Sequence, residues 1–324
     1  MQNAFDEDPA APRALPGDAV APPPWHGAHM IHTLSRLLTS WEQRAAVKKP
    51  DLDVRALYQR GCPDYLVDLL PFADHPDFQN AGEEFRQAAL SCGWLAYCEK
   101  TVAIESKIVN PACMHVIDGD IPAIRGEPFR ETASQALVDE SYHILMIVKA
   151  CEVMRRKRGL GHLQIPDFEL IRQLRSCRAK YPEDWQHVLV QLAFAVVSEV
   201  MVSDYLRLLS DAKSIQPINY LTTEIHRRDE SAHSAVFKTV GAAVLHALSP
   251  REQEFFLQIL PEPARWFADA ELRVWRSMLA QIDFPHADRM LDDCQNAGRK
   301  GVELDLNKLD ELYVDLEISR TFRI

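Results

Sequence analysis

The amino-acid sequence predicts an all-α fold, a four-helix bundle with additional peripheral helices. Four long segments carry apolar residues at helical spacing, and we find no convincing strand alternation and no solenoid repeat. The chain has 324 residues, of which 47% are hydrophobic and only 12 are glycine. Such a chain can bury a large core and has few of the turn residues that many short strands would need. We therefore expect a single helical domain over residues 26–324.

The chain is expected to begin with a disordered tail and a peripheral helix. Residues 1–25 contain six prolines among Ala and Asp, a composition that cannot form a packed core. Over residues 29–47, Met30, Leu34 and Trp41 keep helical spacing, and Pro50 closes the segment. This helix is expected to lie outside the bundle.

Four longer segments then provide the bundle, each exceeding the usual helix length. Their predicted ranges are residues 78–109, 129–157, 182–209 and 217–248. Pro111 is expected to end the first segment and Pro250 the fourth, whereas Pro182 suits the first turn of the third. The linker over residues 112–128 has turn signals and is expected to cover one end of the bundle. Helices after Ser249 are expected to pack around the outside, broken by proline at Pro261, Pro263 and Pro285.

Charge and cysteine usage bear on the partners and the compartment of the protein. A formal net charge of −11 argues against a nucleic-acid or anionic-membrane partner. The sequence shows no secretory h-region and no window of about 18 uncharged apolar residues, which predicts a cytoplasmic soluble protein. The seven cysteines show no Cys-x-x-Cys spacing, and we expect reduced core residues: Cys62, Cys92, Cys98, Cys113, Cys151, Cys177 and Cys294.

Two Glu-x-x-His pairs are the most informative motif of the chain. Glu140 and His143 lie in one predicted bundle helix, and Glu230 and His233 in another. Residues three apart lie on one face of an α-helix, so a carboxylate and an imidazole can reach the same ion. Two such pairs, with one further Glu from each of two other helices, hold two iron or manganese ions in ferritin-like bundles. The pattern therefore predicts a two-metal site.

The other two predicted bundle helices each supply a candidate glutamate. Glu199 interrupts a long apolar run, where a lone carboxylate would be costly unless it is paired, protonated or bound to metal. Glu105 also lies among apolar residues, and its competitor Glu99 stands next to Lys100, which favours a solvated position for Glu99. His226 lies four residues before Glu230 and on the same helical stripe. The predicted ligand set is Glu105, Glu140, His143, Glu199, His226, Glu230 and His233.

Each of these residues also has an ordinary interpretation. A single Glu-x-x-His pair is common by chance, Glu199 could pair with an arginine, and His226 could be exposed. The metal site is preferred because all seven residues occur in order on four long helices. Asp139 and Asp229 are expected to accept the imidazole N–H of the histidine on the opposite helix, with solvated helix acids as the alternative. The remaining histidines lack such partners and are not expected to bind metal: His26, His29, His32, His75, His115, His162, His187, His246 and His286.

With these residues, the chain from about residue 78 to 285 resembles the diiron arylamine N-oxygenases, typified by the p-aminobenzoate and chloramphenicol-pathway N-oxygenases. The resemblance rests on His226, which matches the third histidine that sets this family apart, and on similar separations between the ligands. It implies a ferritin-like fold, two iron ions in preference to manganese, O₂ as co-substrate and an external electron donor. The implied reaction oxidises an amine through hydroxylamine and nitroso to a nitro product in specialised metabolism, and the implied assembly is a homodimer.

The substrate is less well determined by the sequence. Helical spacing around Glu105 and Glu199 predicts pocket residues Tyr97, Thr101, Val102, Val202, Ser203 and Leu206, although such residues are more often core. This face is largely apolar, whereas a benzoate needs a positive or hydrogen-bonding group. A larger arylamine, an aminophenyl amino acid or a carrier-tethered aliphatic amine therefore stays open. So do two other classes of function, a diiron oxygenase that acts on carbon and a non-catalytic metal-storage bundle.

Overall fold

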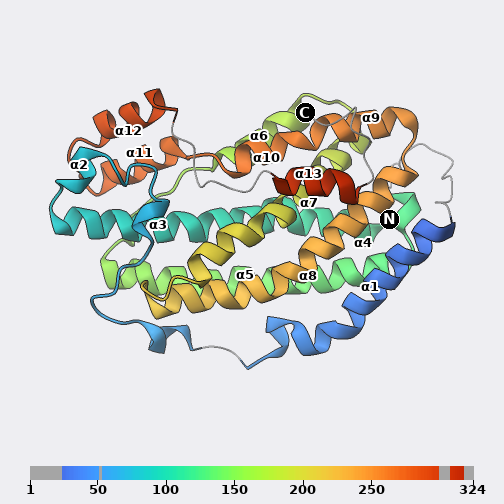
Figure 1. Ribbon diagram of the computed structural model, residues 1–324, viewed down its shortest axis with the longest axis horizontal. Coiled ribbons are helices and arrows are strands. Elements are labelled where there is room, and N and C mark those ends of the chain that lie inside the picture. The colour runs from blue at the N-terminus through green and yellow to red at the C-terminus, as the bar shows by residue number, and fades with distance from the viewer. Residues whose placement is uncertain (1–23, 51–52, 299–306, 317–324) are drawn as a thin grey trace, which may run out of the picture.

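The computed structural model describes residues 24–50, 53–298 and 307–316, and within these ranges it is helical without strands (Figure 1). The all-α prediction is thus confirmed. Residues 1–23, most of the predicted tail, lie outside the described ranges. The described chain starts in α1, Pro24–Arg44, which packs against the bundle helices α5 and α8 as a peripheral helix.

Four long helices form the bundle, as predicted. They are α3 (Glu83–Ile104), α5 (Phe129–Arg158), α7 (Asp184–Ser210) and α8 (Pro217–Ala247). Gly159 ends α5 with a φ of 70°, a left-handed conformation that glycine adopts without a Cβ clash. Pro217 opens α8 at a position where its missing N–H costs no helical hydrogen bond. Pro182 precedes α7 instead of lying in its first turn, because Glu183 caps that helix in a reciprocal box with Gln186.

The prediction that Pro111 ends the first bundle segment is wrong. A π-helical turn, Glu105–Val109, joins α3 to α4, Asn110–Asp118, and the chain stays helical through the proline. In an α-helix the N–H of residue 111 would bond to the carbonyl of Lys107, and proline has no N–H to give. The side chain of Gln191 on α7 compensates by donating to the carbonyls of Lys107 and Ile108 at 3.0 and 2.8 Å. Part of the predicted linker 112–128 is therefore helix.

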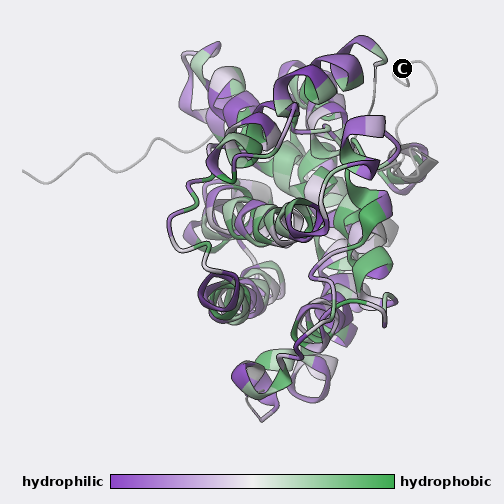
Figure 2. Ribbon diagram, turned by 90° about the vertical axis from the view of Figure 1, so that its left-hand side faces the viewer, coloured by the Kyte–Doolittle hydropathy of each residue, from purple (hydrophilic) through white to green (hydrophobic). Residues whose placement is uncertain are grey.

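Helix α7 forms the centre of the core. Residues 188–201 in its middle are all buried, and it packs against α4, α6, α8, α9, α10 and α13. Among the described residues it is the one helix with the length and composition to cross a membrane, but 76% of that apolar window is buried inside the protein. Figure 2 shows hydrophobic ribbon concentrated toward the middle of the molecule, with hydrophilic stretches along most of the surrounding helices. Burial in the bundle accounts for the composition of α7.

Short helices cover the bundle, as expected for the segments after Ser249. Figure 1 shows α2, α11 and α12 together at one end of the molecule. Pro263 lies inside α10 and does not break it, in contrast to the prediction. The short α-helices are α2 (Pro76–Gln79), α6 (Glu169–Ala179), α9 (Pro250–Ile259), α10 (Pro261–Phe267), α11 (Leu272–Gln281), α12 (Ala287–Asn296) and α13 (Asn307–Asp315). The 3₁₀ turns are η1 (Ala46–Lys48), η2 (Val54–Leu57), η3 (Val67–Leu69) and η5 (Pro122–Ile124).

The cysteines are all free thiols. Six are buried, as the reduced-core prediction requires, whereas Cys62 is only half-buried. Cys62 lies in the loop between η2 and η3, and its backbone carbonyl accepts hydrogen bonds from Arg158 and Gln216.

Candidate metal centre

The seven predicted ligand residues converge between the four bundle helices. Each of their side chains is at most 4% exposed. Glu105 comes from the first residue of the π-helical turn after α3, and Glu199 comes from the middle of α7. The Glu-x-x-His pair of α5 supplies Glu140 and His143, while α8 supplies His226, Glu230 and His233. Residues separated by up to 128 positions thus share one buried cluster.

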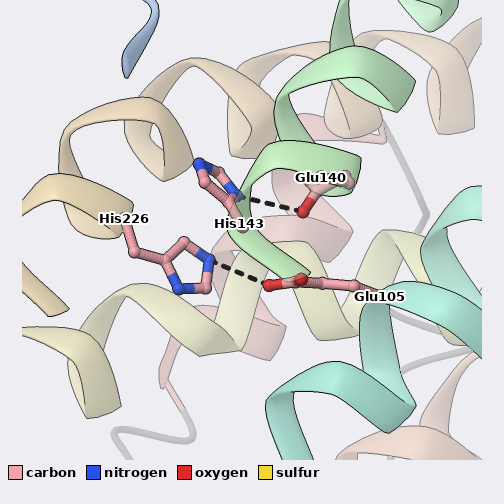
Figure 3. A group of neighbouring side chains, drawn as sticks. All are labelled: Glu105, Glu140, His143 and His226. Atoms are coloured by element: carbon pink, nitrogen blue, oxygen red, sulfur yellow. Dashed lines mark hydrogen bonds and ion pairs between the residues drawn. The ribbon is translucent and has the colours of Figure 1, made fainter. Parts of the chain in front are cut away.

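One group of possible metal ligands joins three helices. Glu105, Glu140, His143 and His226 each present a ligand atom, and these atoms lie within 4.8 Å of one another. Figure 3 shows the ring of His226 on α8 facing the carboxylate of Glu105, with Nε2 3.2 Å from Oε1. Nε2 of His226 also lies 2.7 Å from Oε1 of Glu230, one helical turn away. His226 is therefore part of the cluster and is not a surface residue.

A second group of possible ligands overlaps the first. It consists of Glu140, His143, Glu230 and His233, again with ligand atoms within 4.8 Å of one another. Nδ1 of His233 lies 2.7 Å from Oε1 of Glu140 and 3.9 Å from Oε2 of Glu199. Glu199 belongs to neither group but borders the second. Two overlapping groups that share Glu140 and His143 suit two adjacent ions.

The polar atoms of the cluster fit a pair of cations. One buried carboxylate oxygen in each of Glu105, Glu199 and Glu230, and Nδ1 of His226, lack a hydrogen-bond partner within the described part of the chain. Leaving buried polar atoms unpaired is costly, and cations would satisfy them. Carboxylates and imidazoles are the donors that iron and manganese bind in helical bundles. Four ionised glutamates would also balance the charge of two divalent ions.

The pKa values show how strongly the charges interact without ions. Burial raises the pKa of Glu105 well above its usual range, and the nearby carboxylate of Glu140 adds to the effect. The pKa of Glu199 is raised well above its usual value for the same reasons, burial first and then Glu230. Burial also opposes ionisation of Glu230, but the imidazoles of His226 and His233 hold its pKa well below the usual range. Divalent ions bound in the cluster would favour the ionised form of these carboxylates.

Two aspartates cross-link the Glu-x-x-His helices. Nε2 of His143 on α5 lies 3.1 Å from Oδ2 of Asp229 on α8. Nε2 of His233 on α8 lies 3.1 Å from Oδ2 of Asp139 on α5. Both aspartates are buried, which disagrees with the alternative of solvated helix acids. Each aspartate lies beside the histidine of the opposite helix, as the sequence analysis expected. Such a contact fixes the ring orientation and leaves Nδ1 free to face the cluster.

Residues around α1 hold these aspartates in turn. Trp41 donates its indole N–H to both carboxylate oxygens of Asp139 at 3.0 Å. Arg44 and the backbone N–H of Ala46 donate to Asp229, at 3.3 and 3.1 Å. Sequence reasoning treated this helix only as peripheral packing. No local pattern marks Trp41 or Arg44, because their partners lie about one hundred or more residues away.

The competing residue Glu99 lies outside the cluster. Its carboxylate accepts a hydrogen bond from Arg155 at 2.9 Å, and its side chain is 40% exposed. Six residues, about one and two-thirds helical turns, separate it from Glu105, so the two side chains face different directions. Histidines not expected to bind metal have other partners: His75 contacts Asp293, His115 contacts Asp120, and His187 contacts the Tyr181 carbonyl.

A solvent-connected cavity leads to the cluster. Glu105, Glu199, His226 and Glu230 form part of its wall, so the ligand atoms can be reached from the cavity. Most of the wall is apolar or aromatic. Its other residues include Tyr65, Gly93, Ala96, Tyr97, Lys100, Thr101, Ile104, Phe168, Val202, Tyr205, Phe267, Asp269, Glu271 and Trp275.

Three of the six predicted pocket residues line this cavity, namely Tyr97, Thr101 and Val202. Val102, Ser203 and Leu206 are not among its lining residues, and Leu206 is fully buried in the core. The cavity follows one face of α3, including positions 93, 97, 100 and 104, and positions 199, 202 and 205 of α7. Each misplaced residue is one position beyond this face, and one position turns a helix by about 100°.

The tyrosines of the cavity wall were only partly foreseen. The hydroxyl groups of Tyr65 and Tyr205 form a short hydrogen bond with each other. Gly93 permits this arrangement, because a Cβ at that position would lie 2.6 Å from the ring of Tyr65. Tyr65 comes from a loop before the bundle, so helical spacing around Glu105 could not identify it. The cavity wall therefore contains tyrosine hydroxyl groups that the predicted pocket residues did not include.

Comparison with known proteins agrees with the geometry. The family model described as p-aminobenzoate N-oxygenase AurF matches residues 28–316. The chain is also 34% identical over 268 residues to the 4-aminobenzoate N-oxygenase of Streptomyces thioluteus, an alignment that covers 82% of this chain and 80% of the relative. Members of the family are helical diiron oxygenases, and this chain supplies the buried Glu and His groups that such a centre needs. The chain therefore belongs to the p-aminobenzoate N-oxygenase AurF family.

Proposed function

We propose that this protein is a diiron N-oxygenase that oxidises the amino group of an arylamine with O₂. The observation that carries the proposal is the place of His226, whose Nε2 lies 2.7 Å from Glu230 and 3.2 Å from Glu105 inside the cluster. A bundle with only two Glu-x-x-His pairs lacks this third imidazole. Membership of the N-oxygenase family gives independent support.

Seven side chains would hold the two iron ions: Glu105, Glu140, His143, Glu199, His226, Glu230 and His233. Bound iron supplies the activation of O₂ at this site. The first oxidation joins one oxygen atom of O₂ to the amine nitrogen and releases the other as water, using two electrons and two protons from an external reductant. Further rounds convert the hydroxylamine through the nitroso to the nitro compound.

The protein's own residues position the substrate and keep water away. The cavity wall includes Glu105 and His226, so an amine nitrogen in the cavity can approach the cluster directly. Phe267 and Trp275 contribute flat apolar surface, suited to an aromatic ring. Holding the nitrogen beside the reacting centre reduces the entropy that the reaction must lose. Asp139 and Asp229 would keep the ligand imidazoles in one orientation during turnover.

The test is product analysis with labelled oxygen. The full chain would be loaded anaerobically with Fe(II), mixed with reductant and ¹⁸O₂, and incubated with a panel of arylamines, aliphatic amines and hydrocarbons. Arylhydroxylamine, nitroso or nitro products with ¹⁸O on nitrogen would support the proposal. Label on ring carbon would identify an oxygenase that acts on carbon. Iron uptake without any oxygenated product would identify a metal-storage bundle.

We also propose that the protein is a cytoplasmic homodimer that consists of one helical domain per chain. Support for dimer formation comes from the outer face of α5, where Val138, Leu145 and Val148 are 44%, 49% and 48% exposed. Their spacing places them along one side of the helix. Light scattering during gel filtration tests the mass, and a monomer at micromolar concentration would contradict this assembly.

A further inference from the structure

Charged side chains line the cavity at the end that lies away from the metal-ligand cluster, toward the start of α3. Lys100 lies five residues before Glu105, about 7.5 Å along the helix axis. That distance is comparable with the length of an aniline ring and its para substituent. Lys100, Asp269 and Glu271 all line the cavity, and the two acids belong to the segment that joins α10 to α11. An arylamine with its nitrogen at the cluster would therefore bring its para substituent close to these three side chains.

Lys100 is already neutralised in the structure. Its Nζ lies 3.0 Å from Oε1 of Glu271 and donates a hydrogen bond to the carbonyl of Phe267 at 3.1 Å. The two side chains of the ion pair are only 17% and 10% exposed. A substrate carboxylate would have to share or displace a partner that the protein itself provides. Lys100 is thus a weaker anion receptor than an unpaired lysine.

Glu271 is held firmly in this position. Its carboxylate accepts a hydrogen bond from the backbone N–H of Glu169 at 3.0 Å, and its own N–H donates to Oδ1 of Asp269 at 2.7 Å. Its backbone is left-handed, with a φ of 53°. Burial raises the pKa of Tyr205 to about 12, the hydrogen bond with Tyr65 opposes this shift, and the nearby carboxylate of Glu271 adds to it.

Asp269 adds a second negative charge at the same end. Its carboxylate forms no ion pair with any residue in the described ranges and accepts a hydrogen bond from the backbone N–H of Glu271. Lys100 is the one Lys or Arg side chain among the lining residues, so it can balance only one of the two acids. The end of the cavity beside Lys100 therefore carries a net negative charge when both acids are ionised.

We propose that Glu271, together with Asp269, is a specificity determinant that favours arylamines with a neutral or cationic para substituent over those with a carboxylate. An ammonium group, such as that of an aminophenyl amino acid, meets two carboxylates here, whereas a benzoate meets them with the same sign of charge. Repulsion between like charges is strong in a partly desolvated cavity. This inference rests on the proposed N-oxygenase function. It implies that this chain prefers a substrate other than 4-aminobenzoate, the compound in the name of its relative.

Three ligands of nearly the same shape provide the test: 4-aminobenzoate, 4-aminobenzamide and 4-aminobenzamidine, with negative, neutral and positive para groups. Binding to the iron-loaded full chain would be measured by anaerobic equilibrium dialysis. The wild-type protein is expected to bind the amidine at least about tenfold more tightly than the benzoate, the effect of one charge at a few ångströms in a protein interior. Preference for the benzoate would overturn the inference.

The variant Glu271→Gln removes one charge but keeps a side-chain oxygen for the N–H of Glu169. It is expected to reduce the ratio of amidine to benzoate affinity about tenfold and to leave amide binding unchanged. Asp269→Asn should also reduce this ratio, and it leaves the ion pair between Lys100 and Glu271 in place. This second variant provides the test if Glu271→Gln does not fold. The control Glu262→Gln, on α10 and paired with Arg265, should leave the ratio unchanged. An unchanged ratio in both test variants would overturn the proposal.

Turnover of the neutral 4-aminobenzamide distinguishes a failure of the proposed N-oxygenase function from a failure of the proposed charge specificity. Its oxidation by wild type tests N-oxygenation without any charge at the para position. Oxidation of the amide together with a benzoate preference would contradict only the specificity. Absence of any nitrogen oxidation by the iron-loaded wild-type enzyme would overturn the proposed function and, with it, the specificity that rests on it.

Discussion

Nε2 of His143 on α5 lies 3.1 Å from the carboxylate of Asp229 on α8. The pair Asp139 and His233 repeats this contact in the opposite direction at the same distance. Each helix therefore orients the histidine of the other, and neither imidazole can rotate without losing a buried hydrogen bond. Because the aspartates receive further hydrogen bonds from Trp41, Arg44 and Ala46, the arrangement extends outward to α1 and the turn after it.

Replacing Asp229 with Ala is expected to lower iron affinity about 10- to 100-fold, because His143 would lose the acceptor that fixes its ring. Iron affinity would be measured by competition with a chelator, and helicity by circular dichroism. The control is Asp118→Ala, which removes an exposed aspartate from the end of α4. Equal affinity in the two variants would show that the crossed contact does not tune the site.

Replacing Glu199 with Ala is expected to reduce the iron content below the wild-type value of about two ions per chain. Glu99→Ala should leave the iron content unchanged, because Glu99 pairs with Arg155 away from the cluster. Elemental analysis after anaerobic iron loading provides the measurement. A wild-type content near one ion, or retention of zinc in preference to iron, would contradict the two-iron site.

His226→Ala is expected to keep the helical fold and most of the iron, since Glu140, His143, Glu230 and His233 remain. Amine oxidation should fall by about 10- to 100-fold or more, the usual consequence of losing one residue that tunes a metal site. Iron content, helicity and product formation would be measured on one preparation. Undiminished amine oxidation would show that the third imidazole has no part in the reaction.

Gln191→Leu is expected to destabilise the protein by about 1–3 kcal/mol, because the carbonyls of Lys107 and Ile108 would lose their side-chain donor. The π-helical turn that these carbonyls belong to begins with Glu105, so iron affinity should fall as well. Urea unfolding and chelator competition test the two effects. Gln295→Leu, at an exposed position of α12, is the matched control and should change neither quantity.

Local spacing was sufficient to find the seven cluster residues. A Glu-x-x-His pair is placed on one helical face by the geometry of the helix itself, and Glu199 is conspicuous because its neighbours along α7 are apolar. The same local reasoning separated Glu105 from Glu99 through the lysine next to Glu99. It could not show that Lys100 itself lines the cavity, because its partner Glu271 lies 171 positions away.

The sequence by itself determined the helices and the residues that each presents to the bundle interior, because both depend on interactions between residues a few positions apart. Only the tertiary structure decided which groups meet across helices. The continuation of the chain through Pro111 depends on Gln191 of α7, and the support of Asp139 depends on Trp41 of α1. The cavity wall likewise combines Tyr65, the α10–α11 segment and three bundle helices. These contacts follow from the packing of distant segments, which no periodicity along the chain encodes.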